Sequence, residues 1–86
     1  MADLPVTTPP PTLSRRQRAI LGYVADHVAR HGYAPTVREI QERLKISSTS
    51  VVVYGLAGLE QRELIRRTPH VSRSIVLLPA AHEALR

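Results

Sequence analysis

The sequence predicts a small, mainly α-helical fold with one β-hairpin, and three observations lead to this prediction. Three stretches carry apolar residues at helical spacing, and each follows a residue that can cap a helix. The second and third stretches are separated by three or four residues, the spacing of the two helices in a helix-turn-helix. Two short β-compatible runs then enclose a polar loop. Three helices and a trailing hairpin together predict a three-helix winged helix-turn-helix.

The first predicted element is a helix over Arg15–His31. Ser14 can cap its start, and Gly32 stands where a left-handed residue would end it. One face of this helix carries the apolar residues Ile20, Leu21, Val24 and Val28. The preceding residues 1–13 are rich in Pro and Thr. Because such a segment lacks backbone donors and apolar mass, it is predicted to form a flexible arm.

The second predicted helix is short, about two turns long. Pro35 favours an extended approach to it, and Thr36 with Glu39 forms a capping box. Its apolar residues are Val37, Ile40 and Leu44. After a tight connection over Lys45–Ser47, Ser48 can cap the third helix. The inward face of the third helix is predicted to consist of Val52, Leu56 and Leu59.

The β-compatible runs are Leu64–Arg67 and Ser74–Leu78. They are predicted to form a hairpin with an exposed tip, the wing of the fold. The winged-helix domain is therefore predicted to span residues 14–78. Residues 79–86 form a short C-terminal tail, for which one more helical turn and a frayed end are both open.

The length and composition of the chain argue against several classes of function. The 86 residues include 12 Lys and Arg against 7 Asp and Glu, a formal charge of +5, and no Cys. A chain of this length buries too little surface to wall a deep active-site cleft, and without Cys it has no thiol nucleophile or thiolate zinc site. We therefore expect no enzyme, cofactor, metal or small-molecule ligand. No apolar run reaches membrane-spanning length and the first residues do not resemble a signal peptide, so we expect a cytoplasmic protein with no membrane partner.

The outward face of the third helix is the best candidate for a binding surface. If the apolar residues point inward, the 100° helical step sends Ser50, Val51 and Tyr54 outward, with Val53 near the boundary. Single exposed apolar residues are common on protein surfaces. Here, however, they cluster in the first two turns of the second helix of a helix-turn-helix, the part that enters a DNA major groove. The predicted base-reading residues are Ser48, Ser50, Val51, Val53 and Tyr54.

Basic residues surround this helix in the sequence. Eleven of the twelve are Arg, a bias that suits bidentate phosphate contacts and is equally consistent with codon composition. Three of them fall in the hairpin, where a wing contacts phosphates or the minor groove. The predicted backbone and wing contacts are Arg15, Arg38, Arg62, Arg66, Arg67 and Arg73.

Three pairs of residues in the predicted helices call for an explanation. Asp26 and His27 point to different sides of the first helix and make no catalytic triad. His27 and His31 share a face but lack a third ligand, so a solvated pair is expected rather than a metal site. Gly55 and Gly58 weaken the third helix. Gly55 either allows the third helix to approach a neighbour or the DNA groove closely, or it is a destabilising residue that the packed helix tolerates.

Three segments carry a resemblance to a known family. They are the YAPTVREI step between the first two helices, the Ser48-Thr49-Ser50 entry to the third, and the run GLEQRELIRRTPHVSRSIVLL that leads into the wing. Over about Leu13 to Leu78, the chain resembles the N-terminal DNA-binding domain of the LexA family of bacterial SOS-response repressors. The resemblance implies that the five base-reading residues read an operator, and that Arg62 and Arg73 touch the DNA backbone.

The sequence also departs from the family pattern. Glycine is frequent in the family at the turn before the third helix and at the turn after it, where this chain has Lys45 and Glu63, so either turn can be built differently. Some relatives carry acidic residues early in the third helix. Val53 and Tyr54 cannot accept a hydrogen bond from a cytosine amine as a carboxylate does, so a different operator is expected. The family's C-terminal autoprotease and dimerisation domain is not matched.

The leading hypothesis is a sequence-specific double-stranded-DNA-binding transcriptional regulator, most simply a repressor. Two alternatives remain open: a winged-helix module that docks a protein partner, and an architectural or recombination accessory protein. A single module of this kind buries limited surface on DNA. We therefore expect a monomer in solution that pairs on palindromic DNA.

Overall fold

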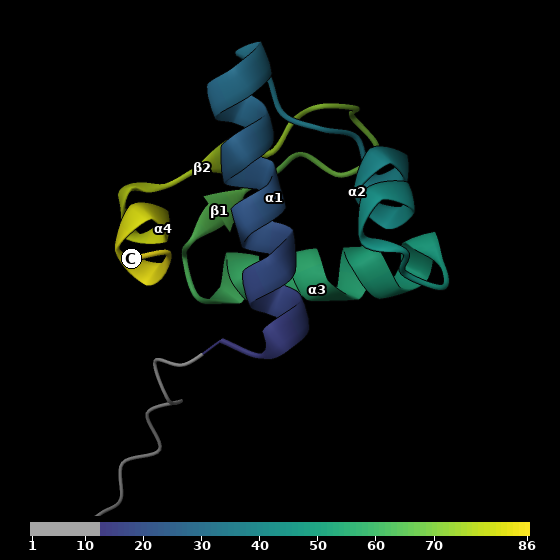
Figure 1. Ribbon diagram of the computed structural model, residues 1–86, viewed down its shortest axis with the longest axis horizontal. Helices are drawn as coiled ribbons and strands as arrows, with labels where there is room; N and C mark the ends of the chain where they lie inside the picture. The colour runs from purple at the N-terminus through teal and green to yellow at the C-terminus, as the bar shows by residue number, and fades with distance from the viewer. Residues whose placement is uncertain (1–12) are drawn as a thin grey trace, which may run out of the picture.

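The computed structural model describes residues 13–86. Helices α1 (Arg15–His31), α2 (Val37–Leu44) and α3 (Thr49–Gln61) are followed by strands β1 (Ile65–Arg66) and β2 (Val76–Leu77) and by helix α4 (Pro79–Ala84). The strands pair antiparallel, with Ile65 opposite Leu77. In Figure 1, α1 crosses α3, α2 and α4 lie on opposite sides of α1, and the hairpin lies behind it. This arrangement confirms the predicted three-helix winged fold.

The helix starts follow the predicted caps. Ser14 Oγ accepts a hydrogen bond from Gln17 N at 3.0 Å, and Thr36 Oγ1 accepts one from Glu39 N at 3.0 Å. Ser48 Oγ accepts from the backbone of α3 in the same way. Each cap satisfies a backbone N–H that has no partner inside its helix. The first two are full capping boxes, so local sequence alone sets where these helices begin.

The two turns at which the sequence departs from the pattern of the family that it resembles keep a left-handed backbone. Lys45 has φ 56° and Glu63 has φ 60°, the region that Gly occupies most readily. Gly32, which ends α1, has φ 81° as expected. The turns are therefore built in the conformation a glycine would favour, and the two side chains bear a strain of about 1 kcal/mol each.

The core lies where α1 crosses α3. Ile20, Leu21 and Val24 of α1 are fully buried, as are Val52, Leu56 and Leu59 of α3 and Ile40 of α2. Leu64, Ile65 and Ile75 of the hairpin region close the core from the other side. These are the faces that the apolar spacing predicts, and they fix which face of α3 remains outside.

Gly55 is buried at the point where α3 meets α1. A Cβ built there would lie 2.7 Å from Ile20 Cδ1, closer than real Cβ contacts allow. Of the two interpretations left open for this glycine, the close approach to a neighbour is the one the structure supports. The neighbour is α1.

The segment 79–86, expected as a short tail, contains α4. Ala81 is fully buried, and Ala84 and Leu85 pack on the core. Arg18 of α1 donates a hydrogen bond from Nη1 to the Ala84 carbonyl at 3.1 Å. Of the predicted arm, only Leu13 belongs to the described residues, and it is buried; residues 1–12 lie outside them. No helix within residues 13–86 is long and apolar enough to cross a bilayer.

Candidate nucleic-acid interface

The outward face of α3 gathers the five predicted base-reading residues. Tyr54 is the most exposed, with 82% of its surface accessible, and Val53 is 39% accessible. Ser50 is exposed, whereas Val51 is half-buried. Ser48 is also half-buried, because its hydroxyl oxygen caps the helix and accepts from Val51 N at 3.4 Å. The structure thus places these residues together on the first turns of α3.

A groove of about 640 Å³ runs along one side of that face, between α3 and the start of α1. Its lining includes Arg16 and Gln17 from α1 and Tyr54 and Arg62 from α3. Arg62 is the residue at which α3 ends. Arg15 is exposed at the first position of α1. Sequence reasoning proposed Arg15 and missed Arg16, which the turn of the helix directs into the groove.

A second groove, of about 700 Å³, lies on the other side of α3. We call the loop over residues 67–75, between the two strands, the wing loop. It lines this groove with Arg67 and Val71, opposite Arg38 of α2 and Thr49 of α3. Arg66 is exposed on β1 and is not part of the lining. The exposed face of α3, which carries the predicted base-reading residues, therefore lies between two grooves, and arginine side chains line both grooves.

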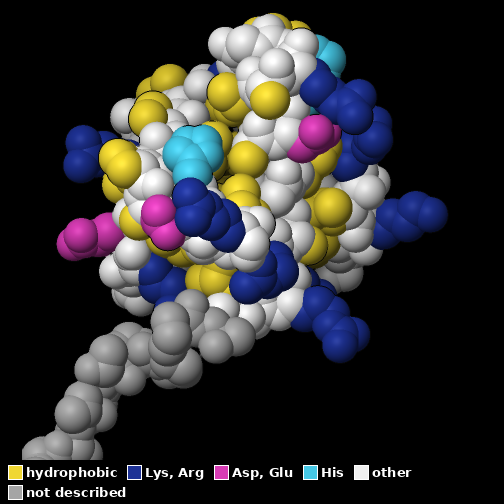
Figure 2. Space-filling view, turned by 60° about the vertical axis from the view of Figure 1, so that its left-hand side comes forward, with side chains coloured by type: hydrophobic (Ala, Val, Ile, Leu, Met, Phe, Trp, Pro, Cys, Tyr) yellow, Lys and Arg dark blue, Asp and Glu magenta, His cyan; other side chains and the backbone are white. Residues whose placement is uncertain are grey.

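Figure 2 shows basic side chains projecting around much of the outline of the molecule, with few acidic ones between them. This agrees with the formal charge of +5. A positive surface of this kind attracts polyanions over a distance set by the ionic strength.

Arg73 does not project freely from the wing loop. Its Nη1 donates to Glu39 Oε1 at 3.1 Å and to the Ala34 carbonyl at 3.0 Å, and its Nη2 donates to Glu39 Oε2 at 3.1 Å. The guanidinium carbon also lies 4.7 Å from the ring centroid of Tyr33. The phosphate contact predicted for Arg73 remains a prediction, but in the free protein this side chain binds α2 and the loop before it.

Glu39, which sequence reasoning assigned only to a cap, also binds Arg73 of the wing loop. Hydrogen bonds lower the pKa of its carboxyl below the ordinary value of 4.5. The largest cause is the bond donated by the backbone N–H of Thr36, and the next is the bond from Arg73. No local signal could reveal this second bond, because 34 residues separate the two partners.

This lowered pKa gives a pH-dependent stability. Ionised Glu39 stabilises the folded state at pH values above 4.5, and that contribution is lost as the pH falls through the lower folded-state value. We expect the difference in unfolding free energy between wild type and Glu39→Gln to shrink as the pH is lowered from 6 to 3, measured by urea denaturation. Glu42→Gln, which removes a charge from the same helix without these hydrogen bonds, is the control. A difference that stays constant to pH 3 would contradict the assignment.

His27 differs from the expected solvated pair. It is buried, and its Nδ1 lies 2.9 Å from the Tyr33 carbonyl oxygen, to which it donates. Its ring also lies 4.4 Å, centroid to centroid, from the ring of exposed His31. The prediction of a solvated pair is wrong for His27, because the loop after α1 folds back over the face of α1 that carries this residue. Within residues 13–86 no group of three or more His, Asp or Glu side chains is placed to hold a metal ion.

Comparison with known proteins identifies the family of this fold and interface. The sequence profile described as LexA DNA binding domain matches residues 11–74. The chain belongs to the LexA DNA-binding domain family. Similar proteins include the LexA repressor of Roseiflexus sp. (strain RS-1), 56% identical over 63 residues, and that of Herpetosiphon aurantiacus, 48% identical over 68 residues. A LexA repressor of Shouchella clausii is 47% identical over 66 residues.

These matches cover 73%, 79% and 77% of this chain, but only 29%, 32% and 32% of the respective LexA repressors. The chain thus spans less than a third of the length of these relatives. The match to the family profile includes α1, α2, α3 and the wing loop up to residue 74. Strand β2 and helix α4 lie beyond the matched range, although Ala81 of α4 is part of the LexA-like core seen here.

Proposed function

We propose that this LexA-family chain binds double-stranded DNA sequence-specifically and represses transcription in the cytoplasm by occupying promoter DNA. The observation that carries the proposal is the exposed start of α3 between two arginine-lined grooves. An α-helix of this kind fits the major groove with its N-terminal residues at the base edges. The flanking grooves then face the phosphates on either side.

The chemistry of the α3 face suits base recognition. The hydroxyl of Ser50 can donate to or accept from a base edge, and Val53 can pack on a thymine methyl. The phenolic hydroxyl of Tyr54 can likewise donate to or accept from a base edge. The face carries no carboxylate, so it does not offer the acceptor that a cytosine amine would require.

The arginines around α3 suit backbone contact rather than base readout. We propose that Arg15 and Arg62 contact the strand on the α1 side, and that Arg38, Arg66 and Arg67 contact the strand on the wing side. Arginine binds phosphate in a bidentate fork, and each neutralised phosphate releases counterions. These contacts fix the register of the domain on the duplex.

Selection of bound sequences from a random duplex pool tests this function. A sequence-specific regulator yields an enriched motif, and its affinity for that motif falls steeply as salt is raised. A module that docks a protein through the exposed apolar residues of α3 yields no motif. An architectural protein yields salt-sensitive binding without a motif.

The assembly state follows from the size of the domain. We propose a monomer in solution that pairs on palindromic half-sites, because the exposed large apolar residues within the described part of the chain are scattered over the loop after α1, helix α3 and the hairpin. A stable dimer needs a contiguous contact of about 1,200 Å² or more. Sedimentation of the free protein at tens of micromolar is expected to give the monomer mass of 9.6 kDa. A predominantly dimeric species would overturn this proposal.

A further inference from the structure

Arg73 ties the wing loop to the beginning of α2. It engages both carboxylate oxygens of Glu39 at 3.1 Å and the carbonyl of Ala34 at 3.0 Å. Three of its five N–H hydrogens are therefore used inside the protein. The fork-shaped pairing of a guanidinium with a carboxylate fixes direction as well as distance, so it defines where the wing loop sits.

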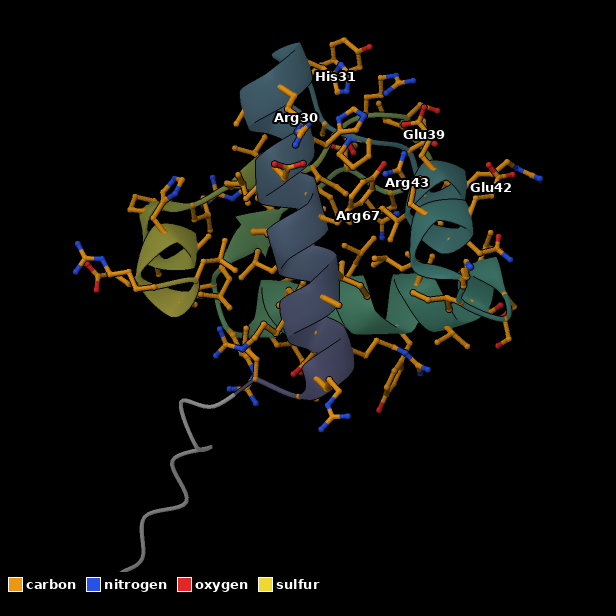
Figure 3. All side chains as sticks on the ribbon, in the orientation of Figure 1. Arg30, His31, Glu39, Glu42, Arg43 and Arg67 are labelled. Carbon is orange, nitrogen blue, oxygen red and sulfur yellow. The ribbon has the colours of Figure 1, made fainter. Side chains whose placement is uncertain are left out.

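The partner of Arg73 is itself held in place. Glu39 Oε1 accepts a hydrogen bond from Thr36 N at 2.9 Å, as part of the capping box of α2. The carboxylate thus joins the first turn of α2 to the wing loop. Figure 3 shows Glu39 at the upper end of α2, with Arg67 lying between α1 and α2. Both Arg73 and Arg67 line the groove beside α3.

The wing loop is also closed across its base. Ser74 Oγ accepts from Thr68 N at 3.0 Å and donates to the Thr68 carbonyl at 2.9 Å. This pair holds the two ends of the loop together, but it does not attach the loop to the helices. The ion pair of Arg73 and Glu39 supplies that attachment.

In place of the phosphate contact that the sequence predicts for Arg73, we propose that this side chain is a positioning residue, which holds the wing loop against α2 so that Arg67 faces the DNA backbone. The inference rests on the proposed DNA-binding function. Its electrostatic reason is that a swing of Arg73 onto a phosphate would leave the Glu39 carboxylate beside the DNA without its guanidinium partner. A wing loop that is already fixed in the free protein also loses less conformational entropy on binding DNA than an unattached loop would lose.

Substitution of two glutamates of α2 tests this proposal, because weaker DNA binding is expected for one variant and equal or tighter DNA binding for the other. Glu39→Gln and Glu42→Gln each remove one negative charge from the same helix, which by long-range electrostatics strengthens DNA binding. Of these two glutamates, only Glu39 is hydrogen-bonded to Arg73 among the described contacts. We expect Glu42→Gln to bind the selected duplex as tightly as wild type or more tightly. We expect Glu39→Gln to bind about fivefold more weakly, the effect of losing a partly exposed ion pair.

The double variant shows whether Arg73 acts through Glu39. If it does, Arg73→Gln with Glu39→Gln binds no more weakly than Arg73→Gln alone. Glu39→Gln binding as tightly as wild type would overturn the proposal, and so would a double variant that binds more weakly than Arg73→Gln alone. Either result would mean that the two side chains do not act as one unit on the wing loop. Thermal unfolding of each variant identifies any that fail to fold, and hydrogen exchange of the folded variants gives a second readout that does not require DNA.

Hydrogen exchange of the free protein tests the positioning role of Arg73 independently of DNA binding. We expect Arg73→Gln to speed exchange of the Thr68 and Val71 amides several-fold, because the loop that shelters them is no longer attached. Arg67→Gln removes the same charge from the same loop and is expected to leave these rates unchanged. Equal rates in both variants would overturn the positioning role. If wild type binds no duplex, the proposed function fails, and the exchange rates still decide whether Arg73 positions the loop.

Discussion

Tyr54→Ala is expected to weaken binding to the selected duplex by about 1 to 3 kcal/mol, roughly 5- to 150-fold, and to leave binding to random duplex nearly unchanged. The reason is its position. Tyr54 is 82% exposed on α3 and borders the groove shared with the start of α1. Its side chain contributes little to the core, so truncation should change the free energy of unfolding by no more than about 0.5 kcal/mol.

Fluorescence anisotropy with the two duplexes, together with urea denaturation, measures all three quantities. His82→Ala on α4 is the control, because it shortens an exposed side chain on an element that borders neither groove. Equal losses on the selected and random duplexes would assign Tyr54 to the DNA backbone instead of the bases. An unchanged affinity for the selected duplex would remove Tyr54 from the interface.

The helices could be predicted from the sequence because their determinants are local. Ser14 and Thr36 cap helices through residues three positions away, and a repeat of apolar residues every three or four positions defines which face is buried. The same periodicity correctly predicts that Ser50 and Tyr54 are exposed on α3, but it places Val51 outward and Val53 near the boundary, whereas Val53 is exposed and Val51 is half-buried. The candidate base-reading residues could still be named before any coordinates were known.

The remaining features depend on contacts between distant parts of the chain. Arg73 meets Glu39 across 34 positions, and Arg18 meets Ala84 across 66. The sequence marks Arg73 as a wing cation but carries no local sign of its partner. It likewise marks His27 as a helix residue without showing that the Tyr33 carbonyl covers it. Such pairings arise only when the elements pack, so periodicity and capping cannot reveal them.

The same distinction applies to the left-handed turns. The sequence shows that Lys45 stands where relatives often have Gly, and from that alone a different turn is a reasonable hypothesis. The structure shows the left-handed conformation retained, with φ 56°. The packing of α2 and α3 on α1 therefore determines this turn, and the residue at position 45 tolerates the strain.

Gly55→Val is expected to destabilise the fold by about 1 to 3 kcal/mol, the usual cost of overfilling a packed core. A Cβ at this position would lie 2.7 Å from Ile20 Cδ1, and Ile20 is fully buried and has no space to retreat into. The two helices must then separate. Since a domain of this size has only a few kcal/mol of stability, urea denaturation should show a clear fall in the midpoint.

Gly58→Ala is the matched control, one helical turn further along α3. A Cβ there would meet Gln17 Nε2 at 2.6 Å, the far end of a partly exposed side chain whose Oε1 accepts from Ser14 N in the capping box of α1. Moving this side chain weakens the cap, whereas the substitution gains about 1 kcal/mol of helix propensity. We therefore expect Gly58→Ala to be close to neutral. If Gly55→Val proved as stable as Gly58→Ala, the crossing of α1 and α3 would be able to widen without cost, and the close approach at Gly55 would not be what sets the position of α3.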